Sequence, residues 1–210
     1  METGSRPVPV FPLPGLVLFP HVVIPLRVFE HRYRTMVRDA LAADRSIAMA
    51  LLKPGWEEDY AGSPEFHPLL CIARIEDAEW QTDDCYKLSV KGLARAEARR
   101  VTREFPYRAV LVDERPQHPF AEDDPLVLLE RESLLGQYRR LARTLERDPA
   151  EAEDLGFEAL VNVACTLAPI EPDVKLALLE EDSVFERAVK LRECMGRALP
   201  GGPASEGEAN

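Results

Sequence analysis

Prolines near the amino terminus constrain the fold of this 210-residue chain more than any other feature. They stand at positions 7, 9, 12, 14, 20 and 25, and each removes a backbone N–H donor and fixes φ. A central strand cannot lose donors so often, so Val8–Leu13 is predicted to be an edge strand or a polyproline-like run. Pro14-Gly15 is a turn signal, and we expect the runs Leu16–Pro20 and Val22–Leu26 to form further short strands.

The residues that follow combine a helix, a buried strand and a long loop. Apolar side chains recur with helical spacing on one face: Phe29, Tyr33, Met36, Val37, Ala40 and Leu41. Ile47–Leu52 has the length and continuity of a buried strand, which Lys53-Pro54-Gly55 ends. Trp56–Pro68 has few apolar residues and is typical of a long surface loop. Such loops often determine binding specificity, so its aromatic residues are candidates for contacts.

Leu70–Trp80 and Cys85–Ala94 form the clearest predicted hairpin. With the turn centred on Thr82-Asp83, the expected cross-strand pairs are Leu88 with Asp77, Val90 with Ile75 and Gly92 with Ala73. Two further runs, Leu93–Arg99 and Tyr107–Val112, are also strand-like, and in all we expect about six strands around one helix. This arrangement suggests a small barrel or a strongly curved sheet.

Leucine-rich helical segments make up the second part of the chain. Two apolar stripes are expected there: Leu128, Leu134, Leu135, Tyr138, Leu141, Ala142 and Leu145, then Phe157, Leu160, Val161, Ala164, Leu167 and Ala168. Pro172 suits the first turn of a short helix, and Ser183-Val184-Phe185-Glu186 has the capping-box pattern for a last one. We therefore predict an α+β fold with a flexible segment 1–6, a β part at 7–118, a helical part at 119–199 and a disordered tail at 200–210.

Composition and charge narrow the class of function. The net charge of −11 argues against a general nucleic-acid binder, whose affinity comes from neutralising phosphates. No uncharged apolar run approaches the roughly 18–20 residues that cross a bilayer, and the proline-broken start leaves no apolar region for a secretory signal. We therefore expect no membrane association and a cytoplasmic location. Cys71, Cys85, Cys165 and Cys194 are widely spaced without a CxxC pair, which favours reduced structural thiols.

No motif in the sequence supports catalysis or a cofactor. The dipeptide Gly-Lys is absent, which excludes a GxxxxGK(S/T) phosphate loop, and neither GxGxxG, GxSxG nor HExxH occurs. Only His21 and His31 are histidines close in sequence, and a predicted strand-to-helix change separates them, so no metal site is indicated. Lys87, Ser89 and Lys91 alternate on a charged strand face, whereas a nucleophilic serine needs a desolvated lysine. We expect no enzymatic activity, no cofactor and no metal.

Three blocks of the sequence resemble one protein family. The first runs from Pro9 to Glu30, with a PxxPL start and later FP and PL pairs before the first helix. The second is Val90-Lys91-Gly92-Leu93-Ala94-Arg95, and the third comprises 167–170 and 175–180 in the helical part. Together they resemble the amino-terminal, substrate-binding domain of Lon proteases from Pro7 to Ala198. The first block is the most specific, because so many prolines must coincide.

The resemblance implies a PUA-like β pseudo-barrel followed by a C-terminal helical bundle. It also implies capture of unfolded or degradation-marked polypeptides. In the family an ATPase and a serine–lysine peptidase follow this domain, but the missing phosphate loop means that neither activity is carried over. The implied protein is a non-catalytic polypeptide-binding module, an adaptor or chaperone-like protein in proteostasis, with a protease or chaperone as a further candidate partner.

Peptide capture needs an exposed apolar groove or strand edge. The candidate contacts come from the proline-rich edge and the long loop: Phe11, Leu13, Phe19, Trp56, Tyr60 and Phe66. The alternative for each is packing, in the core for Phe11 and Phe19 and within the loop for the other aromatics. An RNA-binding module is the alternative function, by analogy with PUA domains, through the arginines after the hairpin: Arg95, Arg99 and Arg100. The net negative charge makes nucleic acid the weaker candidate partner.

Overall fold

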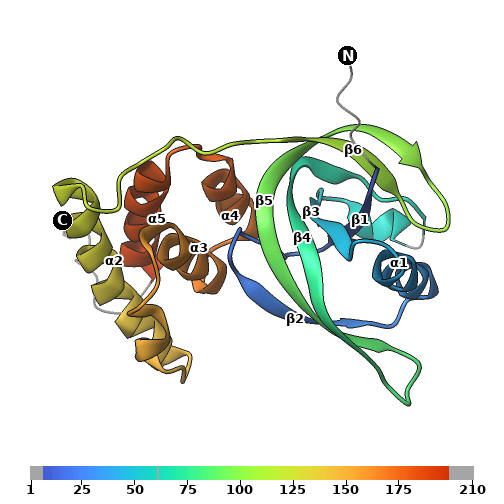
Figure 1. Ribbon diagram of the computed structural model, residues 1–210, viewed down its shortest axis with the longest axis horizontal. Helices are drawn as coiled ribbons and strands as arrows, with labels where there is room; N and C mark the ends of the chain where they lie inside the picture. Colours follow the sequence, from blue (N-terminus) through green and yellow to red (C-terminus); the bar gives the residue numbers. More distant parts are fainter. Residues whose placement is uncertain (1–6, 61, 199–210) are drawn as a thin grey trace, which may run out of the picture. The chain divides into compact units, whose positions relative to one another are not determined.

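The computed structural model of this chain describes residues 7–60 and 62–198. The segments expected to be flexible or disordered, 1–6 and 200–210, therefore lie outside the described residues. The chain divides into two compact units after Pro116. Among the described residues, the first unit contains six strands and one α-helix, and the second contains four α-helices (Figure 1). The predicted α+β class is confirmed.

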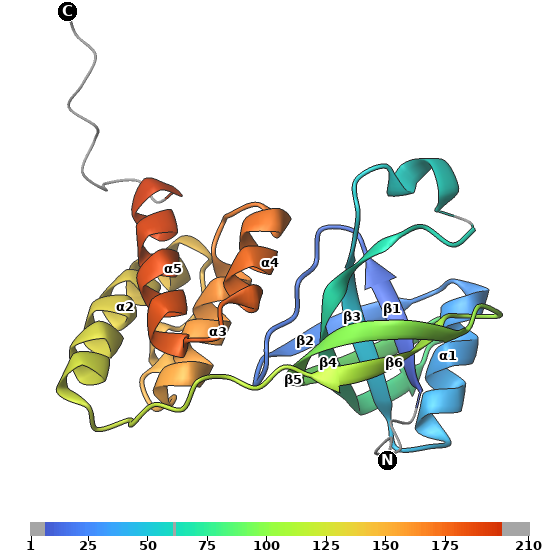
Figure 2. The same ribbon diagram turned by 90° about the horizontal axis from the view of Figure 1, so that it is seen from above.

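The strands of the first unit form one mixed sheet in the order β2-β5-β4-β3-β1-β6. They are β1 (Val8–Leu13), β2 (Val23–Val28), β3 (Ser46–Leu52), β4 (Phe66–Trp80), β5 (Tyr86–Arg103) and β6 (Ala109–Glu114). The sheet curls round on itself because β5 also pairs with β6 (Figure 2). The closure is uneven, since residues 86–91 of β5 pair with β2 and residues 96–103 pair with β6. The result is the expected pseudo-barrel.

Of the two prolines in β1, Pro12 lies where the sheet does not need a backbone donor. β1 runs parallel to β3 and pairs with β6 through Val8 and Pro9. The Val10 N–H then donates to the carbonyl of Arg108, just before β6, at 2.8 Å. Because backbone groups alternate along a strand, Pro12 faces the same side as Val10, beyond the start of β6. On this side the second half of β1 is therefore an open edge. The predicted edge strand is wrong for the first half, because β1 lies between β3 and β6 in the sheet and pairs with both.

Gly92 lets the segment before β2 cross β5 closely. Its N–H donates to the Val22 carbonyl and its carbonyl accepts from the His21 N–H, both at 2.9 Å. A Cβ at this position would lie 2.1 Å from the Phe19 carbonyl oxygen, so a side chain does not fit. The strand predicted at Leu16–Pro20 is wrong, because this apolar run is buried as a crossing segment and pairs with no strand there.

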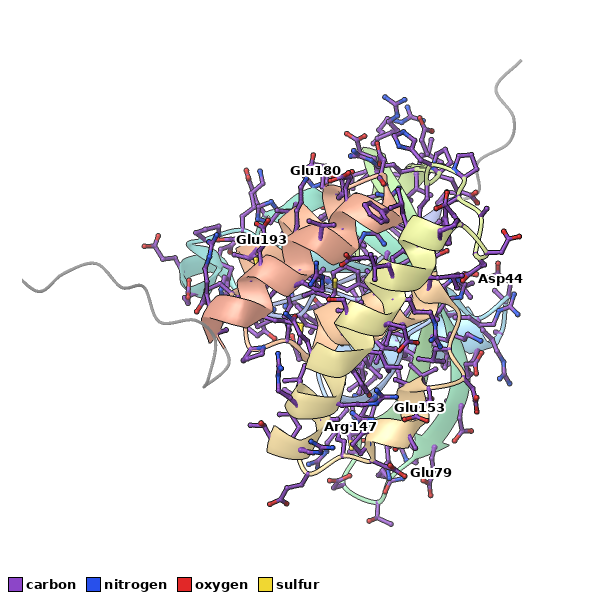
Figure 3. The ribbon with its side chains drawn as sticks, turned by 90° about the vertical axis from the view of Figure 1, so that its left-hand side faces the viewer. Asp44, Glu79, Arg147, Glu153, Glu180 and Glu193 are labelled. Atoms are coloured by element: carbon purple, nitrogen blue, oxygen red, sulfur yellow. The ribbon has the colours of Figure 1, made fainter. Side chains whose placement is uncertain are left out.

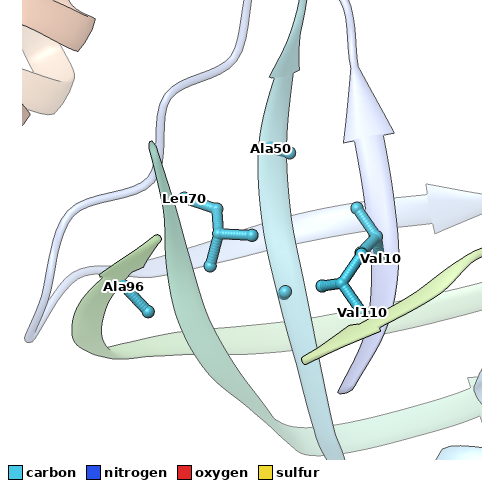
Figure 4. Close-up of a cluster of buried hydrophobic side chains, with 6 residues drawn as sticks. Val10, Ala50, Leu70, Ala96 and Val110 are labelled. Atoms are coloured by element: carbon cyan, nitrogen blue, oxygen red, sulfur yellow. The ribbon is translucent and has the colours of Figure 1, made fainter. Parts of the chain in front are cut away.

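A compact core fills the pseudo-barrel. Its six buried side chains come from five strands: Val10, Ala48, Ala50, Leu70, Ala96 and Val110 (Figure 4). Three are alanines, and small interior side chains allow a narrow barrel to close. Helix α1 (His31–Leu41) buries Tyr33, Met36, Val37 and Ala40, with the Tyr33 ring 4.7 Å from that of Phe11. Phe29, expected on this buried face, is 66% exposed because the helix begins only at His31.

The β4–β5 hairpin confirms two of the three predicted cross-strand pairs. Val90 lies opposite Ile75, and Gly92 lies opposite Ala73. Leu88 lies opposite Ala78 and not Asp77, because the register shifts between Ile75 and Asp77. Such a bulge adds one residue to one strand and leaves the alternation on either side intact, so the apolar pattern did not reveal it.

The second unit consists of α2 (Pro125–Thr144), α3 (Phe157–Leu167), α4 (Pro172–Glu180), α5 (Val184–Ala198) and a short 3-10 turn, η2 (Pro149–Ala152). Figure 3 shows α2 beside α5 and labels Arg147 and Glu153 near the end of α2 and after η2. The expected cap of α5 is confirmed, since the Glu186 N–H donates to the Ser183 hydroxyl at 3.3 Å. A buried Arg187 on α5 donates to the Asn162 side-chain oxygen of α3 at 2.7 Å.

The predicted apolar stripe of α2 is wrong at its two ends. Leu128 is exposed, because it lies six residues before Leu134 and a helix face repeats after three, four or seven. Val127, seven residues before Leu134, takes the buried position. Leu145 is exposed because the helix ends at Thr144.

Candidate functional site

The aromatic residues of the proline-rich edge lie in the core. Phe11 and Phe19 are 3% and 0% exposed, and the ring of Phe11 packs on Tyr33. Leu13, at the end of β1, is half-buried. Packing therefore accounts for Phe11 and Phe19, and a ligand on this surface would not reach either ring.

Arg32 holds the long loop against the start of α1. Its guanidinium donates to the carbonyls of Tyr60 and Gly62, both at 2.6 Å, and forms an ion pair with Glu30 at 3.0 Å. The Tyr60 hydroxyl donates to Glu30 at 2.8 Å, and its ring meets Trp56 edge-on with centroids 5.3 Å apart. Burial, together with the hydrogen bond to Glu30, raises the pKa of Tyr60 to about 12. The loop is thus a fixed wall of the surface around α1.

The three loop aromatics do not form one patch. Trp56 and Tyr60 are half-buried and contact each other. The loop predicted at Trp56–Pro68 is too long, because β4 begins at Phe66, and the Phe66 ring packs against the pseudo-barrel core instead. The guanidinium of Arg108 lies over the Phe66 ring, 4.6 Å from its centroid. A ligand would therefore meet Arg108 on this side.

A hollow of about 300 Å³ opens between β1, the start of α1, the long loop and the β5–β6 connection. Its walls include the buried rings of Tyr33 and Tyr107 and the half-buried Arg108. Phe105, also a lining residue, is 80% exposed. The Tyr107 hydroxyl donates to Asp39 at 2.8 Å, which fixes its ring. Burial raises the pKa of Tyr33 and Tyr107, so both stay neutral at physiological pH. We call this the Arg108 hollow.

A second hollow, of about 330 Å³, lies on the other side of the start of α1. We call it the Trp80 hollow, after the half-exposed Trp80 that lines it together with Tyr86 and Arg34. The rings of Trp80 and Tyr86 meet edge-on at 4.8 Å, and the Arg34 guanidinium lies 5.8 Å from the Trp80 ring. Arg34 also donates to the Asp84 carbonyl at 2.7 Å. Because His31 lines both hollows, they adjoin at the first residue of α1.

The arginines of the alternative RNA-binding prediction are not gathered as an exposed cationic surface. Arg95 is buried and donates to the Pro116 carbonyl at 2.9 Å. Arg99 is exposed but forms an ion pair with Asp113. Arg100 is exposed on β5. One of the three cations is thus unavailable to a phosphate, and a second is neutralised.

Sequence reasoning missed the residues that line the two hollows most prominently. The sequence pattern indicates only that Trp80 ends a hairpin strand, and the strand patterns do not mark Phe105. A sequence signal exists for the second, since Phe105-Pro106-Tyr107-Arg108 concentrates two rings and a cation in one strand connection. Over residues 7–60 and 62–198, no three His, Cys, Asp or Glu side chains gather as metal ligands. No helix in this part of the chain is both long and apolar enough to cross a membrane.

An uneven six-stranded pseudo-barrel followed by a four-helix unit defines the class of fold, and comparison with known proteins gives the family. The family model of the ATP-dependent protease La (LON) substrate-binding domain matches residues 7–197. The chain belongs to this family. The match is to the substrate-binding domain and not to the peptidase domain.

Solved structures and curated relatives agree with that assignment. A Lon N-terminal domain protein from Xanthomonas campestris is 27% identical, with a TM-score of 0.65 over 90% of this chain and 98% of that one. The N-terminal domain of Mycobacterium avium complex Lon protease has a TM-score of 0.70 and 18% identity over 92% of this chain and 100% of that one, a likeness of fold. Lon protease 2 of Myxococcus xanthus is 28% identical over 88% of this chain. The chain spans 22% of the length of that protease.

Proposed function

We propose that this protein is a non-catalytic polypeptide-binding module and that its β unit binds an extended, unfolded segment across the two hollows at the start of α1. The observation that carries the proposal is the pair of adjoining hollows with exposed rings at Trp80 and Phe105. Exposed aromatic side chains that gather beside concave surfaces commonly mark protein interfaces. Membership of a substrate-binding family points the same way.

The dimensions favour side chains over a cofactor. Each hollow has a volume of about 300 Å³, at the lower end of the range for small-molecule sites. Such a hollow suits one or two large side chains of a bound chain. The aromatic walls of the Arg108 hollow would bury apolar area of such a side chain with little loss of rotamer freedom. Tyr33 is already held by packing, and Tyr107 is held by packing and by its hydrogen bond to Asp39.

The proposal includes a role as an adaptor or chaperone-like protein that presents captured chains to a protease or chaperone in the cytoplasm. Its support is the relatives' description as Lon proteases and the absence from this sequence of a phosphate loop and of the other catalytic motifs considered above. Widely spaced cysteines without a CxxC pair fit a reducing compartment.

The test is binding of a fluorescently labelled, aromatic-containing extended peptide, measured by anisotropy, together with suppression of aggregation of an unfolded protein. The double variant Trp80→Ala and Phe105→Ala should bind about tenfold more weakly, the loss typical of removing aromatic anchors. Leu129→Ala is the matched control, because Leu129 is an exposed apolar residue in the helical unit. Absence of both peptide binding and aggregation suppression by the wild-type protein refutes the proposal, as does equal binding by the double variant.

A further inference from the structure

Arg108 differs from the other arginines around the two hollows. Arg32 donates to two loop carbonyls and pairs with Glu30, and Arg34 donates to the Asp84 carbonyl. Within the described part of the chain, the Arg108 guanidinium has no hydrogen bond or ion pair. It stacks instead over the ring of Phe66 as a cation–π contact. It is a cation with its N–H donors available on the wall of a hollow.

The surroundings of Arg108 leave its charge only partly solvated. The side chain is half-buried, and desolvation lowers the pKa of its guanidinium below the ordinary value, although an arginine remains charged at neutral pH. A partly buried charge gains from a partner, because water solvates it less fully than at an open surface. The Phe66 ring supports one face of the guanidinium and supplies no acceptor. An anionic group inside the hollow would supply the acceptors that Arg108 lacks.

The charges closest to Arg108 do not fill that role. Glu104 also lines the hollow and acts on Arg108 through space, but it is exposed and makes no ion pair with it. The carboxylate of Asp59 accepts from the Ser63 N–H at 3.1 Å. Glu30 is engaged by Arg32 and Tyr60. Among residues 7–60 and 62–198, no carboxylate therefore compensates the positive charge of Arg108 at contact distance.

We infer that the Arg108 hollow binds a carboxylate group of the captured polypeptide, from an acidic side chain or from the chain's carboxyl terminus. This inference rests on the proposed function and gives it a substrate class: extended segments with a carboxylate beside an apolar residue. A planar guanidinium can hold a carboxylate through two parallel N–H···O bonds. The Tyr33, Tyr107 and Phe105 rings would contact the neighbouring apolar side chain.

The start of α1 adds to the attraction. His31 and Arg32 line the same hollow, and the first turn of α1 contains no acidic residue. The amino-terminal end of a helix carries a partial positive charge, which favours an anion nearby, and the N-cap residue Glu30, paired with Arg32, offsets part of it. The carboxylate of Glu104, in the exposed part of the lining, repels a bound anion. Removing the charge of Glu104 should therefore strengthen carboxylate binding.

The experiment uses three versions of one labelled peptide: neutral with an amidated end, the same with one internal glutamate, and the same with a free terminal carboxylate. Wild-type protein should bind at least one carboxylate version about tenfold more tightly than the neutral one, as expected for a hydrogen-bonded charge. The internal and terminal arms identify the source of the carboxylate. Arg108→Gln should abolish the preference while leaving binding of the neutral peptide unchanged. Arg100→Gln, which removes an exposed charge of the same unit, should keep the preference.

Two further variants keep the test valid if Arg108→Gln folds poorly. Arg108→Lys retains a point charge without the planar fork and should leave a smaller preference. Glu104→Gln changes an exposed residue and should increase carboxylate binding about threefold, as for a partly solvated charge pair. Equal binding of all three peptides by the wild-type protein overturns this inference and leaves the proposed function standing. A preference that survives Arg108→Gln also overturns it, and binding of no peptide together with no suppression of aggregation refutes both.

Discussion

Replacing Gly92 with alanine should destabilise the β unit by about 3–5 kcal/mol. The new Cβ would lie 2.1 Å from the Phe19 carbonyl oxygen, 2.9 Å from the Phe19 carbonyl carbon and 3.1 Å from the Cys71 sulfur. Both Phe19 atoms belong to the backbone of a buried segment, so a rotamer change cannot relieve the clash. The crossing segment must therefore move away from β5 by about 1 Å or more to reach ordinary contact distance.

The size of the stability loss follows from the interactions that displacement of the crossing segment disrupts. Overpacking of a well-filled site costs about 1–3 kcal/mol. The displacement also strains two backbone hydrogen bonds, from the Gly92 N–H to the Val22 carbonyl and from the His21 N–H to the Gly92 carbonyl. Each contributes about 1 kcal/mol. A loss of this size is a large share of the stability of a small unit.

Urea unfolding followed by tryptophan fluorescence measures the effect on the β unit, because Trp56 and Trp80 both precede Pro116 and the chain has two tryptophans. Far-ultraviolet circular dichroism follows the helical unit in the same samples. Gly136→Ala is the matched control, since a Cβ there meets nothing within 4 Å and lies inside α2. It should stabilise the helical unit by about 0.5–1 kcal/mol. If the free energy of unfolding from the fluorescence transition of Gly92→Ala lies within about 0.5 kcal/mol of the wild-type value, the predicted clash is refuted.

Three further outcomes test other parts of the structure. Arg187→Met should destabilise the helical unit by about 2–5 kcal/mol in the dichroism transition, because buried acceptors lose a charged donor; a change below about 1 kcal/mol would contradict this. Alkylation of the folded protein at neutral pH should modify the half-exposed Cys194 first, whereas Cys71, whose pKa burial raises to about 12, should react only after unfolding, as peptide mass spectrometry can check. The free energy of unfolding should fall as pH rises from about 10 towards 12, because the Tyr60 hydroxyl, with a pKa of about 12, holds in the folded state a proton that the unfolded chain loses near 10. Tyr60→Phe should flatten that slope in denaturation curves measured across this range.

Much of the fold could be predicted because local chemistry dictates it. Pro12 in β1 lies on an edge that needs no donor, and Ser183 caps α5 as its spacing from Glu186 indicates. The errors arise where a distant segment decides the outcome. The run Leu16–Pro20 is apolar like a strand, but its path is set by the close approach to Gly92, more than seventy positions further along the chain. A bulge in β4 likewise depends on pairing with β5, which single-strand patterns do not encode.

The candidate site was harder to predict, because its properties exist only between segments. Phe11 and Phe105 are both phenylalanines beside prolines, yet one is 3% and the other 80% exposed. The difference follows from packing, because the Phe11 ring lies against Tyr33 of α1 whereas Phe105 belongs to the β5–β6 connection at the surface. The same holds for charge. Arg32 and Arg108 cannot be distinguished by residue type, and what separates them is that Arg32 finds carbonyl partners in the long loop whereas Arg108 meets a ring. Whether an arginine has an available donor depends on which acceptors the fold places beside it, and the sequence does not give those positions. Sequence patterns therefore indicate the aromatic residues of the long loop, whereas the structure indicates Arg108.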